Sequence, residues 1–254
     1  MSTYAVVQLT LDMPSVVKLE RAFKRAHGLT AHDAPTLAKS AFGILVHRLS
    51  YDHAYVLQSA LKDEDIETQV IAESDLPVLP PTLFVNRLEC TAAALLVSDS
   101  VNRPAEILWS QVMLVSVGRF PVVEVIRQRL SGKSNRDNFA ATSDVDGAIS
   151  YESKQVHTRK TVVEVITRGA VPRVTILPER PVMFQYLEKR KSRNETDNVR
   201  SFLRDMAPFV PEAGWNRGAR GLLASKAELM GFPSKDAFHQ EMIWLLLKEA
   251  ENGR

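Results

Sequence analysis

Residues 4–72 decide the fold, and they contain YAVVQLTL (4–11), PSVVKLERAFKRAHGL (14–29), GILVHRL (43–49), SYDHAYVLQSALK (50–62) and ETQVIA (67–72). The first stretch alternates like a half-buried strand, and the second and fourth repeat apolar residues at helical spacing. A short helix is expected at 33–40, and Ser50 suits the N-cap of the helix after it. This order predicts a β-α-α-β-α-β unit. Its core is expected to contain Val16, Leu19, Phe23, Leu37, Leu57 and Leu61.

From Gly28 to Val70 the residue types follow one known domain pattern without a gap. The matching positions are Ala34, Leu37, Ser40, Ala41, Leu45, Ser50, Asp52, Ala54, Leu57, Ala60, Leu61, Glu67 and Val70. This register resembles the C-terminal domain of the ribosomal stalk protein, whose fold is shared with the Clp-protease N-end-rule adaptor. The resemblance implies a domain that binds protein partners and catalyses no reaction.

The resemblance also implies a partner-binding site on the first helix. In the stalk family this helix presents an apolar residue and basic side chains, and the matching positions here are Val17, Arg21 and Lys24. A further family lysine falls on Pro35, which has neither the charge nor a backbone N–H. The alternative is that Arg21 and Lys24 only form a solvated helix face.

The rest of the chain predicts a second, mostly antiparallel β domain. Three prolines within residues 75–82 indicate an extended linker after a first domain at 1–74, and short apolar runs with polar turns follow. The run 105–115, with Trp109, and the helical pattern at 194–207 resemble small bacterial pleckstrin-homology-like barrels. We therefore expect such a domain at 83–210, with Trp109 in its core and a polar surface insertion at about 130–155.

The last segment, 211–254, is expected to be a helical extension. Phe238, Met242, Leu245 and Leu246 form one apolar stripe, which Ile243, Trp244 and Leu247 widen. So wide a stripe must be covered, either by the second domain or by a homodimer or partner contact.

Composition sets limits on the function. The 254 residues include 32 basic and 30 acidic side chains, a net charge of +2, so any nucleic-acid binding has to be local. The single Cys90 cannot form an internal disulfide, and no export signal or 18-residue apolar run is present. These features predict a cytoplasmic protein that does not contact membranes.

The sequence contains no recognisable catalytic, cofactor or metal motif, since the six histidines and one cysteine show no ligand spacing. The strongest local charge is the cluster Lys189, Arg190, Lys191 and Arg193, which is either a phosphate- or RNA-binding site or a solvated turn. The leading hypothesis is a non-enzymatic interaction or adaptor protein without a cofactor. The alternatives are an RNA- or ribosome-associated protein that uses this cluster, and an enzyme of unfamiliar type.

Overall fold

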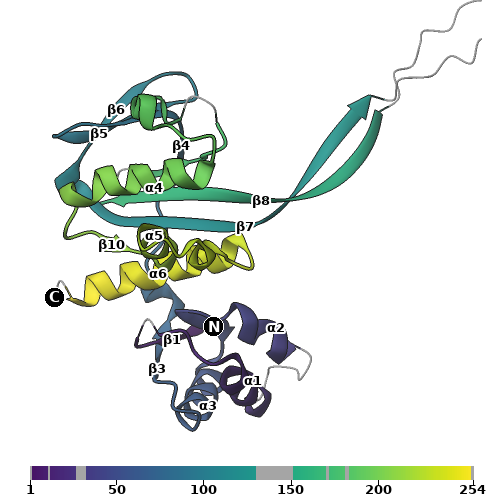
Figure 1. The fold of residues 1–254 in the computed structure, drawn as a ribbon. Coiled ribbons are helices and arrows are strands. Elements are labelled where there is room, and N and C mark those ends of the chain that lie inside the picture. The colour runs from purple at the N-terminus through teal and green to yellow at the C-terminus, as the bar shows by residue number, and fades with distance from the viewer. Residues whose placement is uncertain are drawn as a thin grey trace, which may run out of the picture.

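The protein is an α+β molecule with two sheets (Figure 1). It was analysed as a computed structural model that describes residues 2–10, 12–26, 33–129, 151–169, 172–180 and 183–252. The smaller sheet belongs to the N-terminal part of the chain. The larger sheet is built by the rest, and the C-terminal helix lies between the two (Figure 1).

The smaller sheet has three antiparallel strands in the order β2-β1-β3. Its elements are β1 (Tyr4–Gln8), α1 (Val16–Arg25), α2 (Asp33–Ser40), β2 (Ile44–Leu49), α3 (Tyr51–Lys62) and β3 (Thr68–Ala72). This is the predicted element order. The Ser50 side chain accepts a hydrogen bond from the backbone N–H of His53 at 3.3 Å, as expected of an N-cap. The expected helix end at Gly28 lies outside the described residues.

The helices α1, α2 and α3 bury their apolar stripes against one face of this sheet. Leu19, Phe23, Leu57 and Leu61 are buried there, and Leu37 is half-buried. The prediction was wrong for Val16, which is 42% exposed. The buried stripe of α1 begins one turn after Val16 and consists of Leu19, Ala22, Phe23 and Ala26. Val16, the first residue of the helix, therefore lies beyond the edge of the core.

The larger sheet has seven strands in the order β10-β7-β8-β9-β4-β5-β6. They are β4 (Thr82–Cys90), β5 (Ala94–Asp99), β6 (Pro104–Leu108), β7 (Val112–Arg129), β8 (Tyr151–Thr167), β9 (Arg173–Ile176) and β10 (Gly214–Trp215). Most neighbours are antiparallel, but β4 pairs with β9, and β7 with β10, in parallel. The sheet is therefore mixed.

One face of the larger sheet packs on helix α4 (Glu195–Met206) through Val199, Phe202, Leu203 and Met206. Trp109 lies in the same core, as expected, and its indole N–H donates to the carbonyl of Thr91 at 3.0 Å. A buried indole with a satisfied N–H is a packing residue rather than a ligand platform.

Strands β7 and β8 form a ribbon that extends far beyond the body of the protein (Figure 1). Their pairing continues from Val112 opposite Thr167 to Arg129 opposite Tyr151. Tyr151 to Gln155, the last residues of the expected surface insertion at about 130–155, are strand residues of β8. Strand β8 continues through these polar residues because their backbone pairs with β7, although they contain no apolar run that would predict a strand. Residues 130–150 lie outside the described residues.

Helix α6 (Lys235–Asn252) is shared by both sheets. Phe238, Met242 and Leu246 pack on β7 and β8, while Trp244 and Leu247 pack on β1 and β2. The Trp244 Nε1–H donates to the carbonyl of Gln8 at 2.7 Å. The chain's own two sheets bury most of the apolar stripe of this helix, and a homo-oligomer contact through it stays a prediction. A further α-helix is α5 (Arg217–Leu223). In the described part of the chain, no helix is long and apolar enough to cross a membrane.

Candidate interaction sites

The first candidate site is an exposed apolar surface at the start of α1. Met13 is 63% exposed and Val17 is 61% exposed, and the partly exposed Val16 lies beside them in sequence. Val16 and Val17 are the first two residues of α1, and Met13 precedes the N-cap of this helix, Ser15, by two positions. We call Met13, Val16 and Val17 the α1 patch. It contains Val17, which the sequence singled out, and two apolar neighbours that it did not.

The basic residues of α1 are held in ion pairs within the domain. Arg21 and Arg25 lie 3.6 and 3.5 Å from the carboxylate of Glu64, which is only 7% exposed. Lys24 contacts Glu20 at 2.6 Å, one helical turn away. The predicted partner residues Arg21 and Lys24 therefore also contribute to the domain's own surface, and partner binding by them stays a prediction.

In the predicted basic cluster at 189–193, Arg190 is paired with a carboxylate. The guanidinium of Arg190 makes two hydrogen bonds to Asp205, at 2.8 and 2.9 Å. Asp205 holds the pKa of Arg190 above its ordinary value through this pair. Lys189, Lys191 and Arg193 are exposed. A carboxylate partner makes Arg190 less available to phosphate, so RNA binding by this cluster stays a prediction without structural support.

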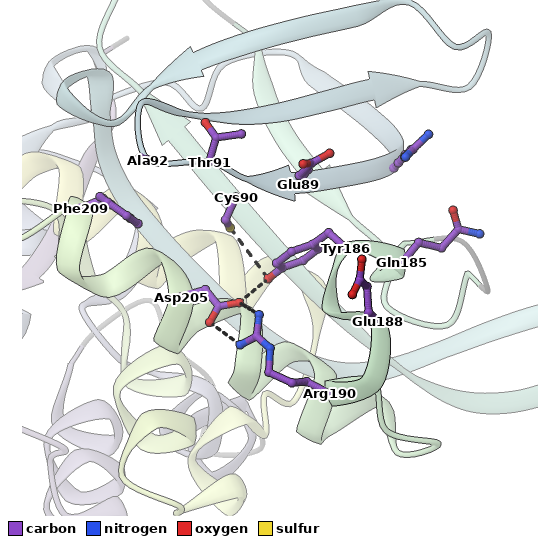
Figure 2. A pocket seen from close by; sticks show the side chains of 11 residues that line it. Glu89, Cys90, Thr91, Ala92, Gln185, Tyr186, Glu188, Arg190, Asp205 and Phe209 are labelled. Atoms are coloured by element: carbon purple, nitrogen blue, oxygen red, sulfur yellow. Dashed lines mark hydrogen bonds and ion pairs between the residues drawn. The ribbon is translucent and has the colours of Figure 1, made fainter.

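Arg190 and Asp205 instead form one wall of a pocket of about 650 Å³, shown in Figure 2. The pocket lies between the end of β4, the short helix Gln185–Arg190 and the end of α4. In Figure 2, Asp205 lies between Tyr186 and Arg190. The Tyr186 hydroxyl donates to Asp205 at 3.1 Å, and the Cys90 thiol points to that hydroxyl at 3.9 Å.

Burial makes the Cys90 thiol unreactive, although its contact with Tyr186 acts in the opposite direction. Burial raises the pKa of Cys90 to about 12, and burial also raises the pKa of Tyr186 above its ordinary value. Because the thiolate is the nucleophilic form of cysteine, Cys90 stays protonated and inert near neutral pH. The arrangement suits a packed polar wall better than a nucleophile and its base.

The pocket rim contains an unusual backbone conformation. Glu188 adopts φ 47° and ψ −115°, a region that a residue with a side chain rarely enters. Such a residue stores about 1–3 kcal/mol of strain and persists only where its surroundings hold it. Here the buried Leu187 and the Arg190 pair fix the chain on either side of Glu188.

Sequence reasoning missed two features. The pocket brings together Cys90, Tyr186 and Asp205, which are far apart in sequence. No local sequence pattern predicts that they come into contact. The β7–β8 ribbon left a weak signal, because residues 119–129 alternate in part and contain Val122, Val123, Val125 and Ile126. Residues 151–160 are polar apart from Tyr151 and Val156, so they show no strand pattern, and those up to 155 were assigned to the polar surface insertion.

The chain matches no family model, no curated protein and no solved structure. Within the described residues, no three His, Cys, Asp or Glu side chains lie close enough together to hold a metal ion.

Proposed function

We propose that the protein is a non-enzymatic adaptor that binds a protein partner through the α1 patch. The observation that carries this proposal is the exposure of Val16 and Val17 in the first turn of α1, together with that of Met13 just before the N-cap of this helix. Scattered single apolar residues are ordinary on a protein surface, but grouped ones surrounded by polar residues are typical of interaction sites.

The surroundings of the patch have the anatomy of an interface rim. Four cations, Lys18, Arg21, Lys24 and Arg25, are paired with three carboxylates, Glu20, Glu64 and Asp65. Interfaces typically combine an apolar centre with a polar, solvated rim. Because the rim has one more cation than carboxylates, the complementary partner surface is apolar at its centre and acidic at its edge.

Two further observations support the same function. The β-α-α-β-α-β order of the first unit agrees with the resemblance to the stalk-protein domain, and that resemblance implies protein binding. In the larger sheet, the buried stripe of α4 agrees with the pleckstrin-homology-like resemblance, whereas the parallel pairing of β4 with β9 departs from it. Both resemblances remain part of the proposal.

The proposal is tested with the substitution Val17→Asp. A charge at the centre of an apolar interface is expected to weaken partner binding about tenfold or more, while an exposed position changes stability by less than about 0.5 kcal/mol. The full-length chain is immobilised, and captured proteins are quantified by mass spectrometry for the wild type and the variant.

The matched control is Val78→Asp, which places the same charge at a position that is 88% exposed and lies outside α1. The proposal predicts a partner that is depleted by Val17→Asp and retained by Val78→Asp. Capture that is the same for all three proteins would contradict it.

A further inference from the structure

The outer part of the β7–β8 ribbon is a two-stranded arm. We define the arm as residues 121–129 and 151–160, which pair with each other from Pro121 opposite Arg159 to Arg129 opposite Tyr151. The other neighbours of these strands stop inside the body, since β10 pairs only as far as Val115 and β9 no further out than Val163. Nine paired residues in each strand, 121–129 and 151–159, give the arm a length of about 30 Å.

The arm presents an apolar row that the described chain leaves open to solvent. Val123 is 52% exposed and Val125 is 61% exposed. Their cross-strand partners are His157 and Gln155, and both of these are exposed as well. A two-stranded ribbon is marginally stable in water by itself. An arm of this length is therefore expected to gain stability from a bound partner.

The arm also concentrates positive charge. It contains five basic residues, Arg127, Arg129, Lys154, Arg159 and Lys160, and two acidic ones, Glu124 and Glu152. Its net charge is thus +3, whereas the whole chain carries +2, so that the remaining residues carry −1. Lys160 is paired with Glu124, and Arg159 is exposed. The arm is therefore strongly basic although the chain as a whole is nearly neutral.

We propose that the arm binds double-stranded DNA by entering its major groove. The major groove of B-form DNA is wide enough to admit a two-stranded β-ribbon. The charge complements the phosphates, and the same charge opposes pairing of the arm with that of a second copy. The apolar row suits the groove floor, where thymine methyl groups are exposed. Double-stranded RNA is excluded as the preferred ligand by its deep, narrow major groove.

The experiment measures the fluorescence anisotropy of a labelled DNA duplex of about 20 base pairs, titrated with the full-length protein at several salt concentrations. Each phosphate contact releases condensed counterions and contributes about −0.9 to the slope of log K against log salt. Three or four contacts predict a slope of about −3 to −4.

Two matched double variants locate the binding. Arg127→Ala with Arg159→Ala removes two positive charges from the arm and is expected to weaken binding about tenfold or more at low salt. It should also make the slope less steep by about 2. Lys189→Ala with Arg193→Ala removes the same charge from the body and is expected to leave both quantities unchanged. Unchanged circular dichroism spectra show that both variants are folded.

The proposal is overturned if the wild type does not bind the duplex at low salt, or if both double variants weaken binding equally. It is also overturned if single-stranded RNA binds more tightly than the duplex and only the body variant weakens it, a result that would favour the cluster at 189–193. Displacement of the duplex by polyglutamate at equal charge would point to an acidic protein partner instead.

Discussion

The two sheets pack on opposite sides of one helix, yet they differ in how completely the chain covers them. The three-stranded sheet is enclosed, with α1, α2 and α3 on one face and α6 on the other. The seven-stranded sheet is covered by α4 and α6 near its centre, but β7 and β8 continue beyond both helices. The enclosed sheet therefore provides a compact body, whereas the larger one also extends an arm on which Val123 and Val125 are exposed.

This difference separates the two proposed binding surfaces. The α1 patch lies on the outside of a unit whose core is complete. The arm is itself an element without a core. Substitutions on either surface are therefore expected to affect binding more than stability, and substitutions in α6 are expected to do the opposite.

The largest expected effect comes from Trp244→Ala. The indole is buried against Ala5, Val7 and Ile44, and its N–H is bonded to Gln8. Removing a buried aromatic side chain typically costs about 3–5 kcal/mol. We expect a decrease of this size in the free energy of unfolding, measured by urea denaturation followed by circular dichroism.

Phe238→Ala is the matched variant on the other side of α6, since Phe238 is fully buried against Phe120 and Phe232. If α6 couples the two sheets, each variant shifts one shared transition. If the larger sheet of the Trp244→Ala protein still unfolds at the urea midpoint of the wild type, that result would contradict this coupling.

The enclosed unit was predictable from the sequence because its signals are local. Ser50 caps α3, and Leu19, Phe23, Leu57 and Leu61 follow helical spacing, so that short windows suffice to place the elements. The role of α6 was only half predictable. The wide apolar stripe of α6 predicted that this helix must be covered, but a periodic pattern does not identify β1, more than 200 residues earlier, as part of that cover.

A fragment that ends near residue 80 is expected to be less stable than the same unit in the whole chain. Such a fragment keeps α1, α2 and α3 but loses α6, and it exposes Ala5, Val7 and Ile44.

The pocket and the arm were not predictable from the sequence either. Contacts such as Tyr186 with Asp205, and strand pairing between polar residues, depend on tertiary structure alone.

A smaller effect is expected at Cys90, which belongs to the larger sheet. Burial raises its pKa from 9.0 to about 12, so at pH 8 the native thiolate should be about a thousandfold scarcer than in the unfolded chain. Reaction with a thiol-specific reagent is expected to be correspondingly slow in buffer and fast in urea. Native labelling within about tenfold of the unfolded rate would contradict the burial of this thiol.

The same shift predicts the direction of a pH effect on stability. Because the folded pKa is the higher one, the unfolded chain releases this proton first as the pH rises above 9.0. The contribution of Cys90 to stability is present below pH 9.0 and is lost progressively between 9.0 and about 12.

Differential scanning calorimetry of the unmodified chain tests the central claim most directly, namely that α6 joins both sheets into one cooperative body. A single transition, with a calorimetric enthalpy equal to the van't Hoff enthalpy, is the result that the shared helix predicts. Two separable transitions, one for each sheet, would contradict it and would show that the α1 patch and the arm belong to independent units.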